Sequence, residues 1–453
     1  MKIAVAGTGY VGLVTGVTLA SIGHIVTCVD VDEKKIRLLT QGISPIYEDG
    51  LEEMMRTHAD RLCYTTDYKS AYSDAEVIFI GVGTPEKKDG SANLSYVYQV
   101  SEQIGRAVRR DCVVVVKSTV PIGTNEHVEK RIQKNLTCDV RVDVVSNPEF
   151  LAQGTAVQDT ICGARIVIGT ENERARQVMQ AVFENFHLPF VFCNRRSAEM
   201  IKYASNAFLA LKISYINEIA NLCEMADANI EDVTKGMGLD PRIGAHFLRA
   251  GIGYGGSCFP KDTKALHWLG NAYDVAPQTI KATIEVNETQ KLCLIKKAKK
   301  YFKSFEGLTV AVLGLTFKPD TDDLREAPSL ENIPIFLEDK AHVKAWDPVG
   351  ATAFAQRYPE VDYKDTIEEA IAGADLCFIF TEWPDVKSFE PSNYAKLMAC
   401  PLVLDGRNCY SPEAVCGKGM IYESIGRPTM NEDVRDAIFQ GDGSENLFYS
   451  RTP

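Results

Sequence analysis

The sequence predicts an α/β protein in which a doubly wound parallel sheet is followed by a helical middle region and a second, smaller α/β domain. From residue 1 to about 195, short β-branched runs alternate with helix-patterned stretches, which is typical of a parallel sheet covered by helices. The stretch from Ser197 to Gly236 has no glycine or proline between its ends and predicts long helices. Strand-like runs return near Leu308 and predict the second α/β domain.

The expected elements follow these patterns along the chain. In the first domain the expected strands are residues 2–6, 25–29, 77–82, 113–116, 142–145, 166–168 and 190–192. Ser197 and Glu199 form a capping start for the long helical stretch. The second domain is expected to have strands at 309–315, 342–346, 376–380 and 402–404.

Four segments are therefore expected. They are an N-terminal nucleotide-binding domain over 1–195, a central helical domain over 196–300, a C-terminal α/β domain over 301–430 and a flexible tail over 431–453. Within the tail, Glu445-Asn446-Leu447-Phe448-Tyr449 resembles part of a protease-site tag, which sets this stretch apart from the fold.

Composition narrows the function classes. The 453 residues are 45% hydrophobic and 24% charged, which suits several folded domains, and a net charge of −12 makes nucleic acid an unsuitable partner. No apolar run reaches the roughly 20 residues of a membrane helix, and the first residues predict a strand rather than a signal peptide. Thirteen scattered cysteines show no metal-type clustering with the histidines, so we expect no metal site and a reduced, cytoplasmic location.

A glycine motif at the end of the first expected strand indicates a dinucleotide site. Gly7-Thr8-Gly9-Tyr10-Val11-Gly12 opens an apolar helix, and the next strand ends in Asp30, about 20 residues beyond the glycines. Gly7 permits the tight turn, Gly9 lets backbone amides approach a pyrophosphate, and Gly12 allows close helix packing. A carboxylate at Asp30 favours NAD over NADP, while the basic residues Lys34, Lys35 and Arg37 keep NADP an alternative.

A second glycine-rich segment carries a candidate nucleophile. In Gly251-Ile252-Gly253-Tyr254-Gly255-Gly256-Ser257-Cys258-Phe259-Pro260-Lys261-Asp262, one thiol lies among glycines and Asp262 follows it by one helical turn. A thiol with an adjacent carboxylate is typical of covalent catalysis, whereas a cysteine at random is expected to be buried and inert. The glycine setting favours the catalytic interpretation of Cys258.

Further candidates lie at strand ends and on the long helix. Lys202 and Asn206 share one helical face and suit an oxyanion, with a solvent-exposed polar stripe as the alternative. Thr84 and Thr119 follow two expected strands, where ligands bind to open parallel sheets, although ordinary turn chemistry would also explain them. Glu149 follows a buried strand at the carboxyl edge of the expected sheet, but by itself it is only weak evidence for a functional site.

These motifs, taken in order, resemble the UDP-glucose/GDP-mannose dehydrogenase family over nearly the whole chain. The resemblance rests on the opening glycine motif, Ser118-Thr119-Val120-Pro121, Asn147-Pro148-Glu149-Phe150-Leu151, Lys202 with Asn206, Gly255-Gly256-Ser257-Cys258-Phe259-Pro260-Lys261-Asp262, and Phe317-Lys318-Pro319-Asp320 with Arg325. It implies two Rossmann-like doubly wound domains joined by a long central helix in a helical middle domain. It also implies a homodimer or a higher homo-oligomer.

The resemblance implies oxidation of the C6 hydroxyl of UDP-glucose to UDP-glucuronate, a precursor in polysaccharide biosynthesis, by two hydride transfers to NAD. Cys258 would form a thiohemiacetal and then a thioester. Lys202 and Asn206 would stabilise oxyanions, Asp262 would assist proton transfer, Glu149 would be the base in thioester hydrolysis, and Thr119 would order water.

The resemblance also implies two sets of binding residues. The cofactor set is Gly7, Gly9, Tyr10, Val11, Gly12, Asp30, Lys35, Thr84, Thr119, Lys261 and Arg325. The substrate set is Glu149, Phe150, Leu151, Gln153, Lys202, Asn206, Arg242, Phe247, Leu248, Arg249, Gly251, Gly255, Phe317, Lys318 and Arg407. Gln153 stands where animal relatives carry a glutamate, so we expect no proton chemistry from it.

Several alternatives stay open. Another nucleotide-sugar dehydrogenase, acting on GDP-mannose or a UDP-N-acetylhexosamine, would use the same thiol, although Ser257, Phe259 and Lys261 favour UDP-glucose. A two-electron hydroxyacid dehydrogenase would leave Cys258 unexplained. A non-catalytic NAD-binding scaffold would leave the thiol, the carboxylates, the lysine and the amide without a purpose.

Overall fold

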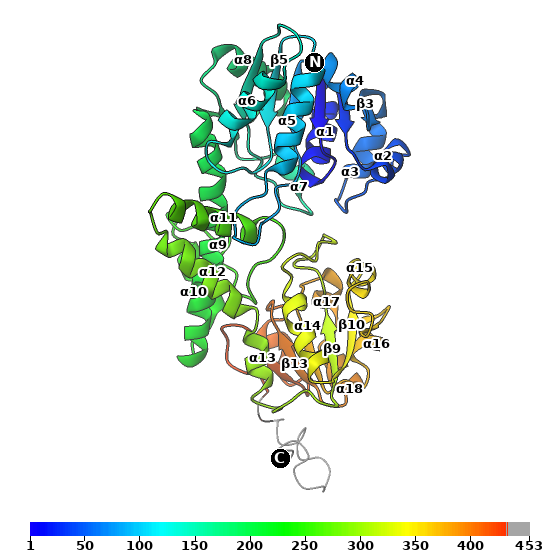
Figure 1. Ribbon diagram of the computed structural model, residues 1–453. Coiled ribbons are helices and arrows are strands. Elements are labelled where there is room, and N and C mark those ends of the chain that lie inside the picture. Colours follow the sequence, from blue (N-terminus) through cyan, green and yellow to red (C-terminus); the bar gives the residue numbers. More distant parts are fainter. Residues whose placement is uncertain (432, 434–453) are drawn as a thin grey trace. The chain divides into compact units, whose positions relative to one another are not determined.

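The computed structural model describes residues 1–431 and 433 of the 453-residue chain (Figure 1). These residues form two compact units. The first unit comprises residues 1–206 and 264–276, and the second comprises 207–263 and the chain from 277 onward. The predicted boundaries of four segments stay a prediction, and the tag-like stretch at 445–449 lies outside the described residues.

The first unit is built on an eight-stranded sheet with the order β3-β2-β1-β4-β5-β6-β7-β8. Adjacent strands are parallel except at the β6–β7 junction, where Ser146 pairs antiparallel with Gly169. The strands are β1 (Lys2–Ala6), β2 (Ile25–Val29), β3 (Leu62–Thr65), β4 (Val77–Ile80), β5 (Cys112–Val116), β6 (Val142–Ser146), β7 (Ile166–Gly169) and β8 (Phe190–Cys193). The chain order reverses beside β1, which is the switch point where open parallel sheets bind ligands.

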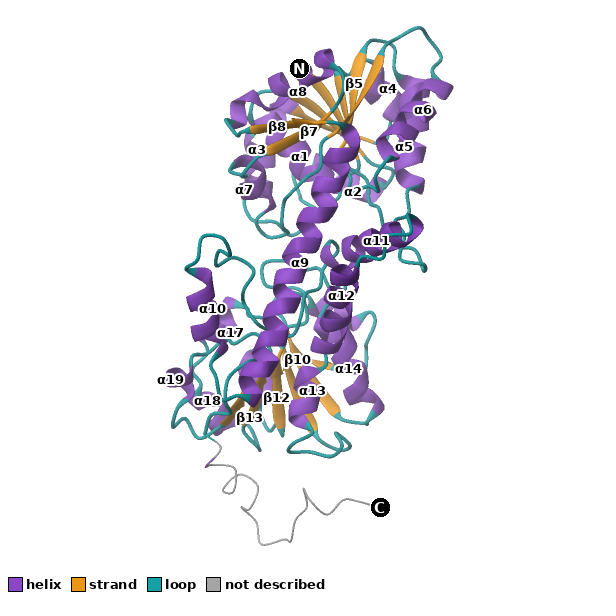
Figure 2. Ribbon diagram, turned by 90° about the vertical axis from the view of Figure 1, so that its left-hand side faces the viewer, coloured by secondary structure: helices purple, strands orange, loops and turns teal. Residues whose placement is uncertain are grey.

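Helices cover both faces of this sheet (Figure 2). Successive residues of the central strands enter different cores, because strand side chains alternate: Ile78 and Ile80 join one cluster, whereas Val77 and Phe79 join the other. The helices of this unit are α1 (Tyr10–Ser21), α2 (Glu33–Thr40), α3 (Leu51–Thr57), α4 (Tyr68–Ser73), α5 (Ser95–Ala107), α6 (Thr124–Asn135), α7 (Ala156–Ile161) and α8 (Glu173–Phe183), with 3-10 turns η1 (Ala59–Arg61) and η2 (Glu184–Phe186).

Two helices cross from one unit to the other along the chain. The 31-residue α9 (Arg195–Met225) carries Lys202 and Asn206 in its first-unit part. Helix α11 (Phe259–Ala272) begins in the second unit and continues into the first. The predicted long helix is therefore confirmed, but the predicted capping start at Ser197 and Glu199 is wrong. The helix begins at Arg195, the Ser197 amide donates to Asn194 Oδ1 at 2.7 Å, and Glu199 accepts from the amides of Gly123 and Asn125.

The second unit contains a six-stranded, wholly parallel sheet with the order β11-β10-β9-β12-β13-β14. Its strands are β9 (Thr309–Leu313), β10 (His342–Trp346), β11 (Asp362–Tyr363), β12 (Leu376–Ile379), β13 (Leu402–Asp405) and β14 (Ile421–Glu423). Its other helices are α10 (Ile230–Gly238), α12 (Gln278–Gln290), α13 (Cys293–Ala298), α14 (Pro328–Glu338), α15 (Ala351–Ala355), α16 (Ile367–Ile371), α17 (Pro384–Ser388), α18 (Ser392–Leu397) and α19 (Pro412–Val415). Two parallel α/β sheets with a helical region between them in sequence confirm the predicted fold class.

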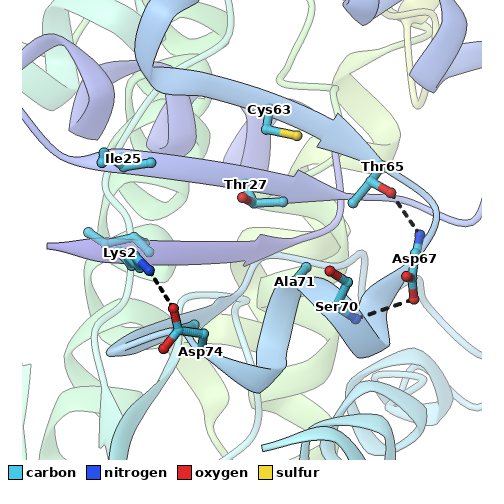
Figure 3. Close-up of a pocket in the computed structure, with 11 residues that line it drawn as sticks. Lys2, Ile25, Thr27, Cys63, Thr65, Asp67, Ser70, Ala71 and Asp74 are labelled. Carbon is cyan, nitrogen blue, oxygen red and sulfur yellow. Dashed lines mark hydrogen bonds and ion pairs between the residues drawn. The ribbon is translucent and has the colours of Figure 1, made fainter.

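A surface pocket of about 360 Å³ lies along β1, β2 and β3, beside α4. Figure 3 shows Thr27 and Cys63 on the strands and an ion pair between Lys2 and Asp74 at one end of the pocket. None of the predicted site residues lines this pocket. Among residues 1–431, no helix is both long and apolar enough to cross a bilayer.

Candidate active site

The glycine motif forms the connection between β1 and α1. Gly7 has φ +95°, and a Cβ there would lie 3.0 Å from the carbonyl oxygen of Gly81. A Cβ on Gly12 would lie only 2.0 Å from the carbonyl oxygen of Gly7, so α1 can approach the turn only with glycine here. At Gly9 a Cβ would have no atom within 4 Å, which leaves the backbone open to a pyrophosphate at the N-terminus of α1.

Asp30 lies directly after β2 and faces the glycine turn. Its Oδ2 accepts from the Thr8 amide at 2.8 Å and the Thr8 hydroxyl at 2.6 Å, and its Oδ1 accepts from the Asp32 amide at 3.0 Å. Burial opposes ionisation of Asp30, but these hydrogen bonds and the charge of Lys35 hold its pKa below the ordinary value. The turn thus holds a carboxylate charge, which suits a ribose diol and repels a 2′-phosphate.

The remaining fingerprint residues lie at the same edge of the sheet. Tyr10 donates its hydroxyl to the carbonyl oxygen of Tyr47 at 2.8 Å, and Val11 follows it on α1. The Thr84 hydroxyl donates to the carbonyl oxygen of Thr119 at 2.8 Å, so the turns after β4 and β5 are joined. Both threonines are buried.

The predicted base and the predicted oxyanion group meet in the first unit. Glu149 Oε1 lies 3.0 Å from Lys202 Nζ, and these side chains are only 5% and 3% exposed. The other carboxylate oxygen accepts from the Leu151 amide at 2.8 Å, and the ring of Phe150 lies 5.4 Å from Lys202 Nζ. Asn206 is buried one turn further along α9. The polar-stripe alternative is wrong, because Lys202 and Asn206 are not exposed to solvent.

Two other buried charged residues of the first unit carry no signal that the motif analysis used. Lys117, which follows β5, is buried and donates to Asn147 Oδ1 at 3.0 Å. Glu48 is buried and accepts from the amides of Gly154 and Ala156 at 2.7 and 2.6 Å. These two hydrogen bonds stabilise the turn that follows Gln153. A charged residue at the end of a strongly apolar run was the available signal for Lys117, whereas Glu48 had no comparable local signal.

The second unit holds the cysteine segment. Cys258 immediately precedes α11, and its carbonyl oxygen accepts from the Asp262 amide at 2.9 Å. Asp262 is buried and forms an ion pair with Lys261, and the Ser257 hydroxyl lies 3.7 Å from Cys258 Sγ. The thiol therefore lies at the positive end of a helix, which favours developing negative charge.

Phe317 and Arg325, from a distant part of the second unit, contact Gly256 of the segment that precedes Cys258. A Cβ on Gly256 would lie 2.7 Å from the ring of Phe317, and the Gly256 amide donates to the carbonyl oxygen of Arg325 at 2.7 Å. Arg325 donates two hydrogen bonds to the carboxylate of Asp323, from Nε to Oδ1 at 2.8 Å and from Nη2 to Oδ2 at 2.7 Å. Lys318 Nζ lies 5.8 Å from the centroid of the Phe317 ring.

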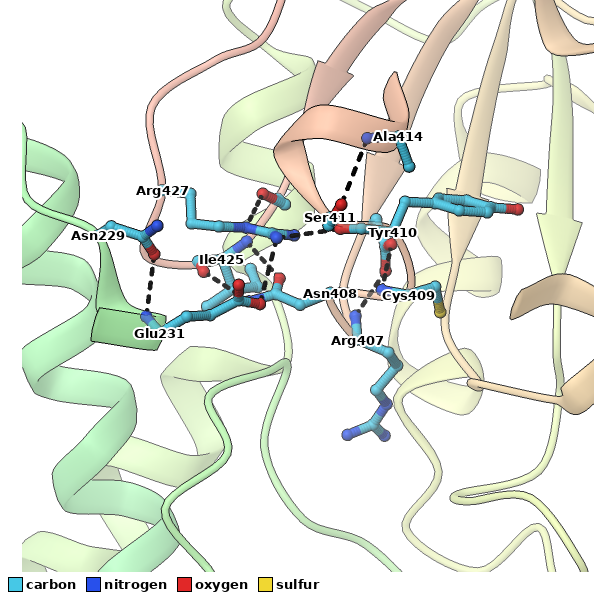
Figure 4. Close-up of polar contacts among 12 residues, drawn as sticks. Asn229, Glu231, Arg407, Asn408, Cys409, Tyr410, Ser411, Ala414, Ile425 and Arg427 are labelled. Atoms are coloured by element: carbon cyan, nitrogen blue, oxygen red, sulfur yellow. Dashed lines mark hydrogen bonds and ion pairs between the residues drawn. The ribbon is translucent and has the colours of Figure 1, made fainter. Parts of the chain in front are cut away.

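Arg407 connects three backbone segments of this unit. It donates to the carbonyl oxygens of Phe380, Gly253 and Phe317 at 2.8, 3.1 and 3.0 Å. Figure 4 shows Arg407 at the start of a loop that continues to Tyr410, whose carbonyl oxygen accepts from the buried Arg427 at 3.0 Å. Arg427 is also paired with Glu231 of α10 at 3.2 Å, so a polar network holds the loop in place.

The other predicted substrate residues divide between this cluster and the surface. Arg249 donates to the carbonyl oxygen of Arg407 at 2.8 Å, Gly251 donates its amide to Asn217 Oδ1 at 2.8 Å, and Leu248 is buried. Phe247 has φ +64° and packs edge-on against Phe259. The side chain of Arg242 is 88% exposed and pairs with Asp240, and among the described residues it contacts no other predicted site residue.

Comparison with known proteins gives a consistent family assignment. Residues 1–187, 196–289 and 311–412 match the NAD binding, central and UDP binding domains of the UDP-glucose/GDP-mannose dehydrogenase family. The chain is 49% identical over 430 residues to the UDP-glucose 6-dehydrogenase YwqF of Bacillus subtilis (strain 168), covering 94% of this chain and 98% of the relative. It is 45% identical to the UDP-glucose 6-dehydrogenase TuaD of the same organism, covering 98% of each chain.

A solved structure agrees with these relatives. A UDP-glucose dehydrogenase from the hyperthermophilic archaeon Pyrobaculum islandicum aligns with a TM-score of 0.87 and 36% identity, covering 93% of this chain and 96% of the other. The three matched domains occur in order and span most of the sequence. The chain therefore belongs to the UDP-glucose/GDP-mannose dehydrogenase family.

Proposed function

We propose that this chain is an NAD-dependent UDP-glucose 6-dehydrogenase that oxidises the C6 hydroxyl of UDP-glucose to the carboxylate of UDP-glucuronate. Relatives with this activity in their names share 44–49% of its sequence over 94–98% of its length. The observation that carries the four-electron chemistry is Cys258, set at the start of α11 behind Gly255 and Gly256 and beside Asp262.

The first unit has the features that NAD requires. The open backbone at Gly9, the close turn between Gly7 and Gly12, and the charged carboxylate of Asp30 suit a pyrophosphate and an unphosphorylated ribose. Tyr10, Val11, Lys35, Thr84, Thr119, Lys261 and Arg325 are the other proposed cofactor residues. NAD supplies the acceptor for both hydrides, so two molecules are consumed per sugar.

In the first oxidation, C6 would give up a hydride to NAD and its hydroxyl proton would pass to solvent, which leaves an aldehyde. Lys202 is the proposed electrostatic stabiliser of the C6 oxygen, and Asn206 on the same helical face donates a second hydrogen bond. The buried Glu149 beside Lys202 orients the ammonium and keeps the pair electrically balanced.

In the second oxidation, the Cys258 thiolate attacks the aldehyde carbon, and a C–S bond forms as the carbonyl electron pair moves to oxygen. Asp262 assists the proton transfers at this centre. Loss of the second hydride converts the thiohemiacetal into a thioester. Glu149 then takes a proton from water, the water oxygen attacks the thioester carbon, and the C–S bond breaks to release the carboxylate and the Cys258 thiolate.

The choice of sugar is the finest part of the proposal. A UDP-D-ManNAc dehydrogenase from Pyrococcus horikoshii aligns over 94% of this chain with a TM-score of 0.83, so the fold accommodates different sugars. The identities of Ser257, Phe259 and Lys261 beside the thiol support UDP-glucose over GDP-mannose and UDP-N-acetylhexosamines. A cytoplasmic location and a homodimer stay predictions.

The electron count tests this function. Limiting UDP-glucose with excess NAD should yield two NADH per sugar for the wild type, and Cys258→Ser should not complete the second oxidation. Cys162→Ser is the matched control, because Cys162 is exposed and lies outside the motif. One NADH per sugar from the wild type would show that the enzyme carries out only the two-electron oxidation of the alcohol. No turnover of UDP-glucose, together with turnover of another nucleotide sugar, would redirect the substrate assignment.

A further inference from the structure

The backbone two residues before Cys258 lies directly against a peptide from a distant part of the second unit. The Gly256 amide donates to the Arg325 carbonyl oxygen at 2.7 Å. A Cβ on Gly255 would lie 2.3 Å from the Glu326 carbonyl oxygen, so the two backbones touch with no space for a side chain. The position of the Arg325–Glu326 peptide therefore sets the position of these glycines.

Glu326 holds this peptide in an unfavourable conformation. Its φ is +55°, in the left-handed region that residues other than glycine rarely adopt. Such a residue persists only where its surroundings over-determine it, and non-glycine strain of this kind clusters at functional sites. A neighbouring contact must therefore hold Glu326 in place.

Lys291, directly after α12, supplies such a contact. Its side chain is 1% exposed, and Nζ lies 3.0 Å from Glu326 Oε2, 3.5 Å from Glu288 Oε2 and 4.0 Å from Glu331 Oε1. Its own carbonyl oxygen accepts from Asn332 Nδ2 at 2.9 Å, which fixes its backbone to α14. Burial alone would lower the pKa of Lys291, but the carboxylates of Glu288 and Glu326 raise it above the ordinary value.

We propose that Lys291 is a positioning residue for the nucleophile. Through its ion pair with Glu326 it holds the Arg325–Glu326 peptide against Gly255 and Gly256, and this contact presents Cys258 in its reactive position. The role of Cys258 in this inference rests on the proposed function. The contact between the two backbones is independent of that function.

The test uses two variants that break the pair in different ways. Lys291→Met removes the charge and keeps the length of the side chain. Glu326→Gly removes the carboxylate but suits the positive φ, so the fold should tolerate it even if Lys291→Met does not fold. Lys291→Arg is the conservative variant and should restore the wild-type behaviour.

Lys297 offers a matched control in the same unit. It is 5% exposed and pairs with Glu224 at 2.7 Å and Glu423 at 3.4 Å. Lys297→Met likewise removes a buried ammonium from the carboxylates that pair with it, so it is a control for the loss of a buried ion pair. None of the three residues lies in the cysteine segment or in 317–326.

The first readout is hydrogen exchange in the full chain without substrate. For Lys291→Met and Glu326→Gly, exchange in a peptide containing Gly256 should rise at least about tenfold, whereas Lys297→Met should leave it unchanged. The second readout is steady-state turnover. Misplacement of the thiol should lower kcat by about 100-fold, with KM for UDP-glucose within about threefold of the wild type.

Wild-type exchange at Gly256 in both pair-breaking variants would overturn the proposal, as would an equal loss of kcat in Lys297→Met. If wild-type protein does not turn over UDP-glucose, the proposed function fails, and the exchange measurement still decides whether Lys291 holds the glycine segment.

Discussion

Single buried charges are prominent in both units. Glu149 and Lys202 neutralise each other, Asp30 is satisfied by Thr8 and Asp32, and Lys291 is surrounded by carboxylates. Lys117 is different, because the one hydrogen bond that its ammonium makes among the described residues goes to the neutral amide of Asn147. A buried cation with so little compensation should affect stability in a pH-dependent way.

Burial lowers the pKa of Lys117 from 10.5 to about 8. The negative charge of Glu149 raises this pKa in part, and the positive charge of Lys202 lowers it further. Between these two pH values the unfolded chain binds more protons, so the stability contributed by Lys117 rises with pH and is constant below about pH 8. The unfolding free energy of wild type minus that of Lys117→Met should therefore increase above pH 8, by at most about 1.4 kcal/mol per pH unit. Denaturant titrations across this range measure the difference, and Lys69→Met, at an exposed lysine, should show none. A flat difference for Lys117→Met would contradict the assigned burial effect.

Asp30 decides between cofactors at the level of one side chain. Asp30→Ala should raise KM for NAD about 10- to 100-fold, because a charged hydrogen-bond acceptor for the ribose is lost. The preference for NAD over NADP should become smaller, because the carboxylate that binds the ribose and repels the 2′-phosphate is gone. The KM for UDP-glucose should change little. Asp30→Asn, which keeps the shape but not the charge, separates repulsion of the 2′-phosphate from hydrogen bonding. Steady-state kinetics with both cofactors give the answer, and an unchanged NAD to NADP ratio in Asp30→Ala would remove Asp30 from cofactor selection.

At the scale of elements, buried apolar runs were sufficient to locate most strands. The runs at 2–6, 25–29 and 342–346 coincide with β1, β2 and β10. The run at 77–82 extends two residues beyond β4, because Gly81 and Val82 belong to the turn that packs on Gly7 and Gly12. Strands β3, β11 and β14 were not expected, because each is an edge strand of only two to four residues and so carries too short a pattern to recognise.

Two glycines of the turn between β1 and α1 make a matched pair. Gly12→Ala should destabilise the first unit by about 3 kcal/mol, because the new methyl group collides with the Gly7 carbonyl and displaces α1. Gly9→Ala should change stability by less than about 0.5 kcal/mol, since that position is open and its φ of −78° suits alanine. It should nevertheless raise KM for NAD about tenfold, because the methyl group enters the space of the pyrophosphate.

Chemical denaturation and NAD titration of both variants check this pair. Equal loss of stability in Gly9→Ala and Gly12→Ala would show that the turn is purely structural. Equal NAD affinity in Gly9→Ala and the wild type would exclude the pyrophosphate from this turn.

For the whole molecule, the division into two units separates the matched NAD binding domain from the matched UDP binding domain. The match to the NAD binding domain covers most of the first unit, and the match to the UDP binding domain lies in the second, where the proposed substrate residues Lys318 and Arg407 supply positive charge in a chain of net charge −12. Each unit has its own sheet and its own apolar clusters. Ligands of one unit should therefore stabilise that unit first.

NAD at 100 times its Kd should stabilise the state that binds it by about 2.7 kcal/mol. In hydrogen exchange, protection by NAD should be largest in the β1–α1 turn at residues 7–12 and around Asp30, and protection by UDP should be largest around Lys318 and Arg407 of the second unit. Protection of residues 7–12 by UDP alone, at the level seen with NAD, would contradict this assignment. Sodium sulfate at the same ionic strength is the control for nonspecific anion effects.

Local spacing was enough to predict the α/β class, the nucleotide turn, the pairing of Lys202 with Asn206 on one helical face, and the candidate thiol. Each of these depends on residues within one or two turns of one another, or on the alternation of buried runs. The pairing of Glu149 with Lys202, the hold of Glu48 on the turn after Gln153, and the contact of Lys291 and Glu326 behind the cysteine segment emerged only when distant segments were folded together. The physical reason is that these side chains are polar and lie far apart in the chain. Their burial and charge depend on which strands and turns the tertiary fold brings into contact, and no local hydrophobic period records that.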